Sequence, residues 1–324
     1  MSYISNLSTE ILSTFGAADI QSLSTAQIQE LSTVQVPVLT SAAIAGMSTA
    51  QIMALDLVDF AVLTSVQIPG ITTSHLRVLN SSQIRALSAD ALPGLTTLQA
   101  ANLSTTQVLA LTTDQVAVLD AEDVAKLGTA QLRVLSSAQV AQLHSDAFAA
   151  LSTAQVGALS SAGVLGLTTA QLATLSTANV TGLSTAQLRA LSSAQIAALE
   201  PADFNVLGTG QLAGLGSNQA LGLTTSQLAT LESGSIARLS TAFIKALGTG
   251  AIASLGTAQI VGLSSAQLAA WSSSDQIRAL ETQDVAQLTT GQIRGLSTLQ
   301  LSYLSSDQLA ALSSAGTNAL STSA

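Results

Sequence analysis

An apolar residue at every eighth position is the feature that most constrains the fold of this chain. The series begins at Leu7, runs without a slip to Trp271, is displaced by one extra residue, and resumes from Leu280 to Leu320, giving 40 anchors in all. With each anchor as position 0, position +5 is nearly always Ile, Leu, Val or Phe, position +4 is most often Gln, and positions +1 and +2 are mostly Ser or Thr. No linker or compositional break interrupts the series, so the sequence predicts one continuous repeat structure over residues 1–324.

An eight-residue period excludes both a continuous helix and a plain strand. In an α-helix, eight residues advance by about 800°, so an apolar stripe would rotate by roughly 80° in each octad. In a strand, positions 0 and +5 would fall on opposite faces. The backbone must therefore turn once in every octad.

The polar residues predict what each octad contains. Ser or Thr at +1 and Gln at +4 match the capping box, in which a hydroxyl and a Gln side chain bond reciprocally at a helix N-terminus. Helices this short are unstable alone, so positions 0 and +5 must be buried against neighbouring octads. We predict an all-α solenoid with one helix of one to two turns in each octad, and the alternative is a β-solenoid. The number of octads in one coil is left open.

Charge placement supports the helical alternative. Of the 18 acidic residues, all but Glu30 lie at +1, +3 or +4, and all nine basic residues lie at +6 or +7. Acids near the N-terminus and bases near the C-terminus of a helix interact favourably with its dipole.

Glycine and proline refine this prediction. Gly is most frequent at +7 and +1, where we expect it to end helices. Pro201 lies at +2, the first helical position. Pro37, Pro69 and Pro93 lie at +6, where an α-helix would lose a hydrogen bond, so some octads should contain 3₁₀ turns instead.

The composition excludes several classes of function. The net charge of −9 and the dispersed basic residues argue against a nucleic-acid partner. The chain contains no Cys, which removes disulfides and thiolate metal sites. Ser or Thr interrupts every apolar run well before it could form a transmembrane helix. The segment from Met1 to Gly16 lacks the basic and apolar regions of a signal peptide. We therefore expect an extracellular or cell-surface protein that is exported without a cleaved leader, and the alternative is a cytoplasmic one.

Residues that could carry chemistry all fit the repeat as structural substitutions. His75 at +4 and His144 at +1 replace cap or surface residues and lack metal-ligand spacing. Residues 120–123, Asp-Ala-Glu-Asp, form the densest acidic cluster, but they lack the ligand order of a calcium loop. The Gly-Thr-Gly segments at 208–210 and 248–250 are octad variants rather than phosphate loops. The sequence predicts no enzyme, no catalytic or metal-binding residue, and no cofactor.

The aromatic residues and the single insertion are the remaining candidates for contacts with a partner. Phe60, Phe148 and Phe204 lie at +5 and should be buried, whereas Phe243 at +4 is expected to be exposed. The extra residue after Trp271 predicts a bulge that the large indole fills, and the alternative is an interaction site.

Two resemblances follow from these motifs. The segment Leu111–Leu119, LTTDQVAVL, resembles the first helix of TAL-effector repeats, but the longer repeat and the base-reading loop of that family are missing. Residues 7–320 as a whole resemble the tandem LSTAQ-type octapeptide tracts of large bacterial secreted or surface proteins. This resemblance implies a repeat protein but no particular binding residue.

Three functions remain open. The first is a structural subunit of an extracellular filament or surface layer that associates head-to-tail, because the repeats run from end to end without charged capping repeats. The second is an adhesin-like scaffold that presents one face to a protein or glycan partner. The third is recognition of ice or a crystal surface by the ranks of Ser and Thr.

Overall fold

The computed structural model describes residues 4–312, which form short helices without a single strand. They divide between Leu167 and Thr168 into two compact units. The all-α prediction is confirmed, whereas the β-solenoid alternative is wrong. The last anchor, Leu320, lies outside the described residues.

The first unit contains these helices: η1 Ile4–Asn6, α1 Thr9–Leu12, α2 Ala17–Gln21, α3 Thr25–Gln29, η2 Val36–Val38, α4 Ser41–Gly46, α5 Thr49–Ala54, α6 Leu57–Ala61, η3 Ile68–Gly70, α7 Thr73–Val78, α8 Ser81–Ala86, η4 Ala89–Gly94, α9 Thr97–Asn102, α10 Thr105–Ala110, α11 Thr113–Ala117, α12 Ala121–Lys126, α13 Thr129–Arg133, α14 Ser137–Gln142, α15 Ser145–Ala149, α16 Thr153–Ala158 and α17 Ser161–Val164.

The second unit contains these helices: α18 Thr169–Ala173, α19 Thr177–Gly182, α20 Thr185–Ala190, α21 Ser193–Ala197, α22 Pro201–Asn205, α23 Thr209–Gly214, α24 Ser217–Ala220, α25 Thr225–Thr230, α26 Ser233–Ile236, α27 Thr241–Lys245, α28 Thr249–Ala253, α29 Thr257–Gly262, α30 Ser265–Ala269, α31 Ser274–Arg278, α32 Thr282–Ala286, α33 Thr290–Gly295, α34 Thr298–Tyr303 and α35 Ser306–Ala311.

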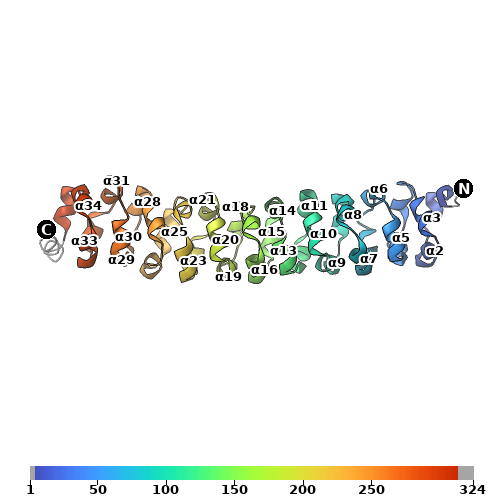
Figure 1. Ribbon diagram of the computed structural model, residues 1–324, viewed down its shortest axis with the longest axis horizontal. Coiled ribbons are helices and arrows are strands. Elements are labelled where there is room, and N and C mark those ends of the chain that lie inside the picture. The colour runs from blue at the N-terminus through green and yellow to red at the C-terminus, as the bar shows by residue number, and fades with distance from the viewer. Residues whose placement is uncertain (1–3, 313–324) are drawn as a thin grey trace. The chain divides into compact units, whose positions relative to one another are not determined.

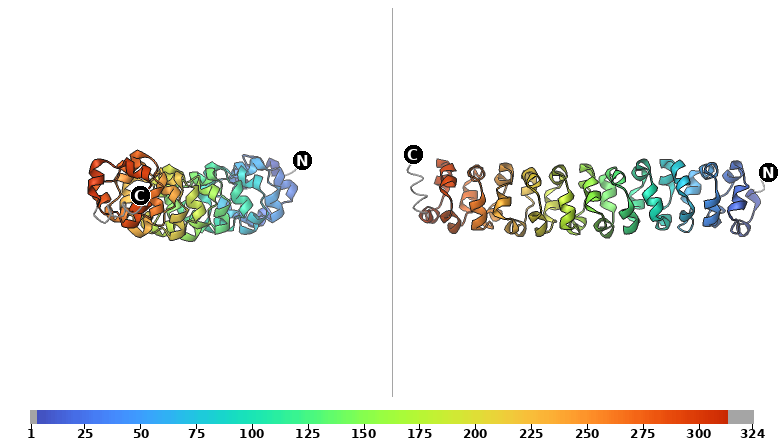
Figure 2. Two further views of the ribbon diagram at one scale, coloured as in Figure 1. Left: turned by 60° about the vertical axis from the view of Figure 1, so that its left-hand side comes forward. Right: turned by 90° about the horizontal axis from the view of Figure 1, so that it is seen from below.

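Three octads make one coil in each unit. Helix α9, which begins at Thr97, packs on α12, which begins three octads later at Ala121. In the second unit α22, which begins at Pro201, packs in the same way on α25, which begins at Thr225. The same separation relates α6 to α8 and α26 to α29. Figures 1 and 2 show the resulting rows of short helices within each unit. The helices of one row therefore share a face of the solenoid, and the octad period places a helix on each of three faces in turn.

The caps follow the sequence prediction. Most helices begin after a Ser or Thr at +1, and the residue at +4 completes the box, as in Ser136 and Gln139 at the start of α14. Helix α12 shows the predicted charge pattern, since Asp120 caps it, Glu122 lies in its first turn and Lys126 in its last. The short helices thus form where cap and dipole interactions agree.

Proline selects the helix type in the predicted way. The three octads with Pro at +6 form the 3₁₀ helices η2, η3 and η4, which contain Pro37, Pro69 and Pro93. In η2 and η3 the proline is the second residue, where the helix needs no amide donor, whereas Pro93 lies inside η4. Pro201 is the first residue of α22, as predicted.

Positions 0 and +5 form the core. Side chains at +5 such as Val108 and Val116 are fully buried, and the anchors Leu87 and Leu111 are nearly so. The small exceptions at +5, Ala100 and Ala220, are buried as well. Burial of each such aliphatic side chain contributes roughly 1.5–3 kcal/mol, which is what holds helices of four to six residues in place.

The expectation that glycines end helices is confirmed at +7, where α4, α19, α23, α29 and α33 each end at a glycine, and is wrong at +1. None of the described glycines has a positive φ, so none forms a left-handed cap. At +1, glycine is the N-cap itself, as in Gly128 and Gly208. At +7, glycine allows two coils to approach closely: a Cβ on Gly166 would lie 1.9 Å from the carbonyl oxygen of Ser137, and one on Gly222 would lie 2.0 Å from that of Ser193.

The extra residue after Trp271 is accommodated as predicted, with the indole fully buried in the gap. Helix α31 begins one residue late, after Ser273. The indole Nε1 donates to the carbonyl oxygen of Ile244 at 2.8 Å, while Gln276 bonds to the carbonyls of Lys245 and Leu247 instead. The tryptophan therefore supplies the hydrogen bond that the displaced octad cannot make.

Candidate functional site: the joint between coils

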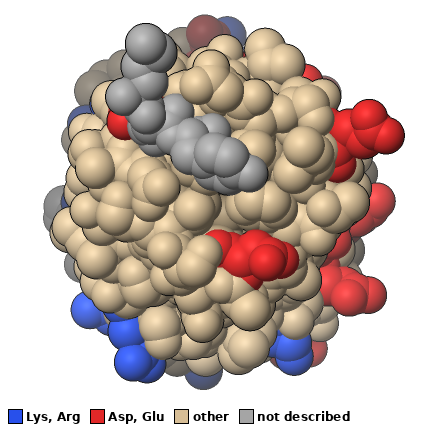
Figure 3. Space-filling view, turned by 90° about the vertical axis from the view of Figure 1, so that its right-hand side faces the viewer, with Lys and Arg blue, Asp and Glu red and all other residues tan. Residues whose placement is uncertain are grey.

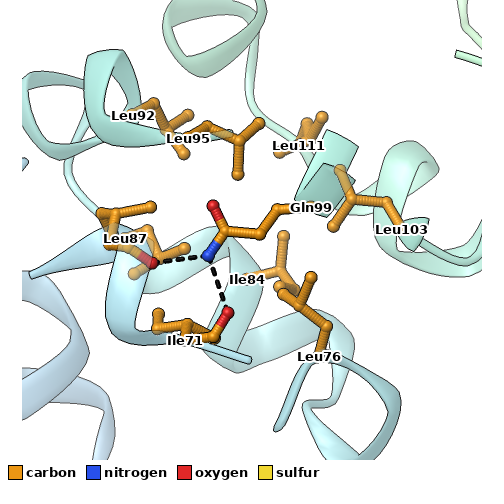
Figure 4. Close-up of a pocket in the computed structure, with 10 residues that line it drawn as sticks. Ile71, Leu76, Ile84, Leu87, Leu92, Leu95, Gln99, Leu103 and Leu111 are labelled. Carbon is orange, nitrogen blue, oxygen red and sulfur yellow. Dashed lines mark hydrogen bonds between the residues drawn. The ribbon is translucent and has the colours of Figure 1, made fainter. Parts of the chain in front are cut away.

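The glutamine at +4 joins each coil to the one before it. Gln99 accepts a hydrogen bond from the Thr96 amide at 2.8 Å through Oε1, which closes the capping box. Its Nε2 donates to two carbonyl oxygens of the preceding coil, those of Ile68 at 2.6 Å and Ile71 at 2.7 Å. Figure 4 shows this amide among aliphatic side chains. One side chain thus closes a helix N-terminus and bonds to two buried backbone carbonyls, of which the Ile68 oxygen also accepts the Ile71 amide.

We call this arrangement the glutamine joint. In it, the Nε2 of a +4 glutamine donates to two backbone carbonyls. One belongs to the anchor three octads earlier, as Ile71 does for Gln99, and the other to the +5 residue just before that anchor, as Ile68 does. The joint recurs throughout both units. Both donated bonds are present at Gln35, Gln51, Gln67, Gln99, Gln107, Gln115, Gln131, Gln139, Gln211, Gln227, Gln259, Gln267, Gln292, Gln300 and Gln308.

His75 reproduces the capping bond and one of the two carbonyl bonds of the joint with a different side chain. Its Nδ1 lies 3.2 Å from the Thr72 amide nitrogen and its Nε2 lies 2.8 Å from the Met47 carbonyl oxygen. The side chain is only 3% exposed. Because the amide donates to Nδ1 and the carbonyl accepts from Nε2, this geometry requires the neutral tautomer with its proton on Nε2. His75 is therefore a cap, as predicted, and also bonds to the preceding coil, which was not predicted.

In two of the octads without a donor at +4, the +1 hydroxyl donates to the anchor carbonyl instead. Where Ala43 replaces Gln, Thr40 Oγ1 donates to the Phe15 carbonyl at 3.0 Å. Where Phe243 replaces Gln, Ser240 Oγ donates to the Leu215 carbonyl at 2.9 Å. The prediction that Phe243 is exposed is wrong, since +4 points toward the preceding coil and the ring is fully buried there.

Four octads carry an aspartate at the same buried position. Each of these aspartates is at most 4% exposed, and each follows an acidic residue at +1 of its own octad. The pairs are Asp56 with Asp59, Asp120 with Asp123, Glu200 with Asp203, and Glu281 with Asp284. Asp59 and Asp203 each accept the +1 amide at 3.0 Å. A carboxylate cannot donate, so these octads lack the amide donor of the glutamine joint.

The environment disfavours the charged form of these four side chains. Burial raises the pKa of Asp59 to about 6, and the neighbouring Asp56 charge adds to the rise, while the Asp56 amide hydrogen bond opposes it. Burial likewise raises the pKa of Asp123 to about 6, with repulsion from Asp120 and Glu122 adding to it. Burial also raises the pKa values of Asp203 and Asp284.

The other sequence candidates are not brought together. The carboxylate of Asp120 accepts the Asp123 amide at 2.8 Å and so acts as a cap. Gly208 and Gly248 are N-caps of α23 and α28 rather than parts of a phosphate loop. His144 is an exposed N-cap. Phe60, Phe148 and Phe204 are buried, as predicted.

The described surface has two open hollows in the second unit, one lined by Trp271 and Leu296 and the other by Glu232 and Gly256. Residues 4–312 include no group of three or more side chains suited to hold a metal ion. No helix within that range is both long and apolar enough to cross a membrane. Seen from the N-terminal side, most of the visible surface is uncharged (Figure 3). An enclosed gap of about 20 Å³ beside Gln99, lined by residues such as Leu92 and Leu95, holds no more than about one water molecule.

The frequent Gln at +4 was visible in the sequence, but the capping box already explained it. Gln at +4 is the commonest polar choice of the repeat, and the capping box accounts for its Oε1 alone. A capping box accepts Glu as well as Gln, yet Glu is absent from +4 throughout the chain. That preference for an amide indicates a role for Nε2, which only the packing of the coils reveals.

Comparison with known proteins agrees with the repeat. A family model described as the ALTTAQ repeat matches residues 12–49, 68–105, 116–153, 124–161, 164–200, 196–233, 228–265, 236–273 and 277–314. No curated protein matches the chain. The matched segments cover most of the sequence and contain the +1, +4 and +5 residues that make the joints, so this chain belongs to the ALTTAQ repeat family.

Proposed function

We propose that this chain is a non-enzymatic structural protein, a subunit of an extracellular filament or surface layer whose copies associate through the faces of their coils. The polarity of the glutamine joint carries the proposal. Each coil presents amide donors to the coil before it and carbonyl acceptors to the coil after it. The two faces of a coil are therefore complementary to each other but not to themselves, and such a contact propagates without closing.

We expect a second copy to bind at the outermost described coils. In the coil of α1, α2 and α3, Gln27 accepts the Ser24 amide at 2.8 Å, but no preceding coil among the described residues reaches its Nε2. Ile11, at +4 of the same coil, is 49% exposed. In the second unit, the Leu304 carbonyl receives no glutamine from the described residues, although the anchor carbonyls of earlier octads do. We propose that the donor face of one copy binds the acceptor face of the next.

The test is the assembly state of the purified chain, measured by sedimentation velocity and negative-stain electron microscopy. We expect open linear assemblies whose length grows with protein concentration. The double variant Ile11→Asp, Gln27→Glu keeps the capping acceptors of its coil but removes the donor and the apolar contact, and should shift the protein toward single copies. The matched control Met53→Asp, Gln29→Glu changes exposed side chains of the same kinds and should assemble normally.

A discrete monomer of the unaltered chain at high concentration would contradict this function. So would equal loss of assembly in both double variants, since that would indicate a general effect of added charge. Export is part of the proposal because a chain without Cys and with 8% charged residues fits an exposed surface protein.

The second candidate is a binding scaffold for a protein or glycan partner. It is favoured by Val34 and Val58, which are 68% and 56% exposed and lie at +3 of octads three apart, hence on one face of successive coils. The buried phenylalanines and Trp271 are inaccessible as anchors for a partner in the folded chain. Assembly that persists in a Val34→Ser, Val58→Ser variant, together with loss of binding to a glycan array, would identify the scaffold role.

A further inference from the structure

We propose that the four buried aspartates at +4 hold a proton in the folded chain and donate it in a hydrogen bond to the carbonyl of the preceding coil, so that each unit is stabilised by acid. These residues are Asp59 and Asp123 in the first unit and Asp203 and Asp284 in the second. The inference is independent of the proposed function.

The first argument is the donor that these octads lack. At this position a glutamine donates to the anchor carbonyl three octads earlier, and where Gln is replaced by Ala43 or Phe243 the +1 hydroxyl donates instead. In the aspartate octads the +1 residue is itself Asp or Glu, so an ionised octad has no side-chain donor at either position. By the repeat, the corresponding anchor carbonyls are those of Leu31, Leu95, Leu175 and Leu255, and no hydrogen bond to any of them is found within residues 4–312.

The second argument is the state of the carboxyl oxygens. Asp203 Oδ2 accepts the Glu200 amide, but its Oδ1 is buried without a hydrogen-bond partner. Asp284 Oδ1 accepts the Thr257 hydroxyl at 2.8 Å, but its Oδ2 is likewise buried without a partner. An unpaired buried carboxylate oxygen is strongly unfavourable. A proton on that oxygen would turn it from an acceptor into a hydrogen-bond donor.

The third argument is the acidic residue at +1. Asp56 Oδ1 accepts the Asp59 amide at 2.9 Å, and Asp120 accepts the Asp123 amide. In the first unit the +1 carboxylate therefore caps the helix N-terminus, where its negative charge is stabilised. In the second unit Glu200 and Glu281 are the N-cap residues, but their side chains make no cap hydrogen bond. The charge at +1 then disfavours a second negative charge at +4, which separates the two carboxyls into one that is ionised and one that is protonated.

In the second unit, the helices packed against Asp203 and Asp284 carry no basic residue that would stabilise an ionised aspartate. Asp203 lies on α22 between α19 and α25, neither of which carries a charged residue, so Glu200 is the nearest charge. Asp284 lies on α32 between α29, which has no charged residue, and α35, which contributes Asp307. Glu281 on its own octad adds a third negative charge.

In the first unit, one basic residue and several acids surround each aspartate. Asp59 on α6 faces α8, which carries Arg85, and Glu30 precedes the anchor Leu31 beneath it. Asp123 on α12 faces α9, which is uncharged, and α15, which carries Asp146 after the N-cap His144. Glu122 and Lys126 share its helix, and Asp90 lies on η4, the helix that supplies the +5 carbonyl beneath it.

The sign of the pH dependence follows from the raised pKa values. A carboxyl with a folded pKa near 6 and an unfolded pKa of about 3.9 binds its proton more tightly when folded. Its stabilising contribution is complete below the unfolded pKa and is lost as the pH rises through the folded pKa. As the pH rises between these two pKa values, each such carboxyl lowers the folding equilibrium constant by up to about tenfold per pH unit. Above the folded pKa, the folding constant no longer depends on this carboxyl's titration.

The experiment compares the unaltered chain with the fourfold variant Asp59→Gln, Asp123→Gln, Asp203→Gln, Asp284→Gln, which restores the consensus joint and should fold. Urea denaturation is measured from about pH 4 to about pH 8 in buffer with EDTA. We expect the ratio of the unfolding constants, unaltered chain over variant, to rise steeply up to about pH 6 and then level off. A control variant with the same charge change, Glu10→Gln, Asp114→Gln, Glu232→Gln, Asp275→Gln, alters exposed acids and should keep the pH dependence of the unaltered chain.

Infrared spectroscopy supplies a direct readout. At a pH of about 5, where exposed carboxyls are largely ionised, the unaltered chain and the control variant should show the C=O stretch of a protonated carboxyl, and the fourfold joint variant should lack it. Parallel pH profiles for the unaltered chain and the joint variant would overturn the proposal, as would absence of that band. Stabilisation of the unaltered chain by calcium ions at about pH 8, without an effect on the joint variant, would also overturn it, since a cation rather than a proton would then fill the position.

Discussion

At the scale of single residues, the fold depends on side chains that complete several hydrogen bonds at once. A glutamine joint satisfies one amide and two carbonyls of the backbone, and these groups are buried. Removing such a side chain leaves backbone groups unpaired, which costs more than the net value of the hydrogen bonds. His75 and Trp271 each place a ring nitrogen against a backbone carbonyl of the preceding coil, as the glutamine amide does in other octads.

Replacing Gln115 by Leu tests the energy of one joint. Gln115 is 1% exposed and accepts the Thr112 amide while it donates to the carbonyls of Ile84 and Leu87. We expect Gln115→Leu to lower the free energy of unfolding of the first unit by about 2–4 kcal/mol. The exposed Gln142 gives a matched control, since Gln142→Leu should change that free energy by less than about 0.5 kcal/mol in urea denaturation.

Two glycines in the second unit predict opposite effects of the same change. A Cβ at Gly222 would lie 2.0 Å from the Ser193 carbonyl oxygen, whereas a Cβ at Gly210 would meet nothing within 4 Å. Gly222→Ala should therefore destabilise the unit by about 1–3 kcal/mol because the coils must separate. Gly210→Ala, inside α23, should stabilise it by about 0.5–1 kcal/mol. Equal effects in thermal denaturation would show that +7 is not a site of close approach.

At the scale of elements, each helix is too short to persist by itself, and its cap decides where it starts. Helix α14 has six residues, and its N-terminus is closed by Ser136 and Gln139. Nucleation of so short a helix is unfavourable, so burial of positions 0 and +5 must hold it. The cap contributes a smaller term that selects the starting residue.

Replacing the cap of α14 separates these two contributions. Ser136→Ala removes the side chain that accepts the Gln139 amide and should cost about 0.5–2 kcal/mol of stability. Ser137→Ala, one position later and exposed, leaves every hydrogen bond of the box intact and should be close to neutral. Urea denaturation of the two variants provides the comparison, and a larger loss in Ser137→Ala would contradict the assigned cap.

At the scale of whole units, each octad makes the same kinds of contact with its neighbours. The free energy of unfolding of a unit is therefore approximately a sum of contributions from neighbouring coils. The packing of α9 on α12 and of α22 on α25 shows that neighbouring coils are three octads apart in the sequence. Removal of a whole number of octads should preserve all joints, and removal of part of an octad should not.

Deletions in the first unit test this additivity. Deleting the segment 104–127 removes one complete coil of three octads and should leave a folded unit whose urea m-value falls with the surface lost. Deleting the segment 105–108 leaves only Ser104, Leu109 and Ala110 between two anchors, which is too short for a helix and its turn. We expect a large loss of helical circular dichroism in the second variant. Comparable folding of both would contradict the coil assignment.

The sequence by itself determined the period, the helix type and the position of almost every cap. These are local properties: a hydroxyl at +1, a dipole-matched charge or a proline at +6 acts within its own octad, so the residues near it in sequence suffice to predict it. The tertiary structure decided what depends on residues three to four octads away, namely the three octads in a coil, the donors of the glutamine joints, the burial of Phe243 and the close approach at the +7 glycines. An octad repeat is compatible with several numbers of octads per coil, and only the packing of one coil on the next selects among them.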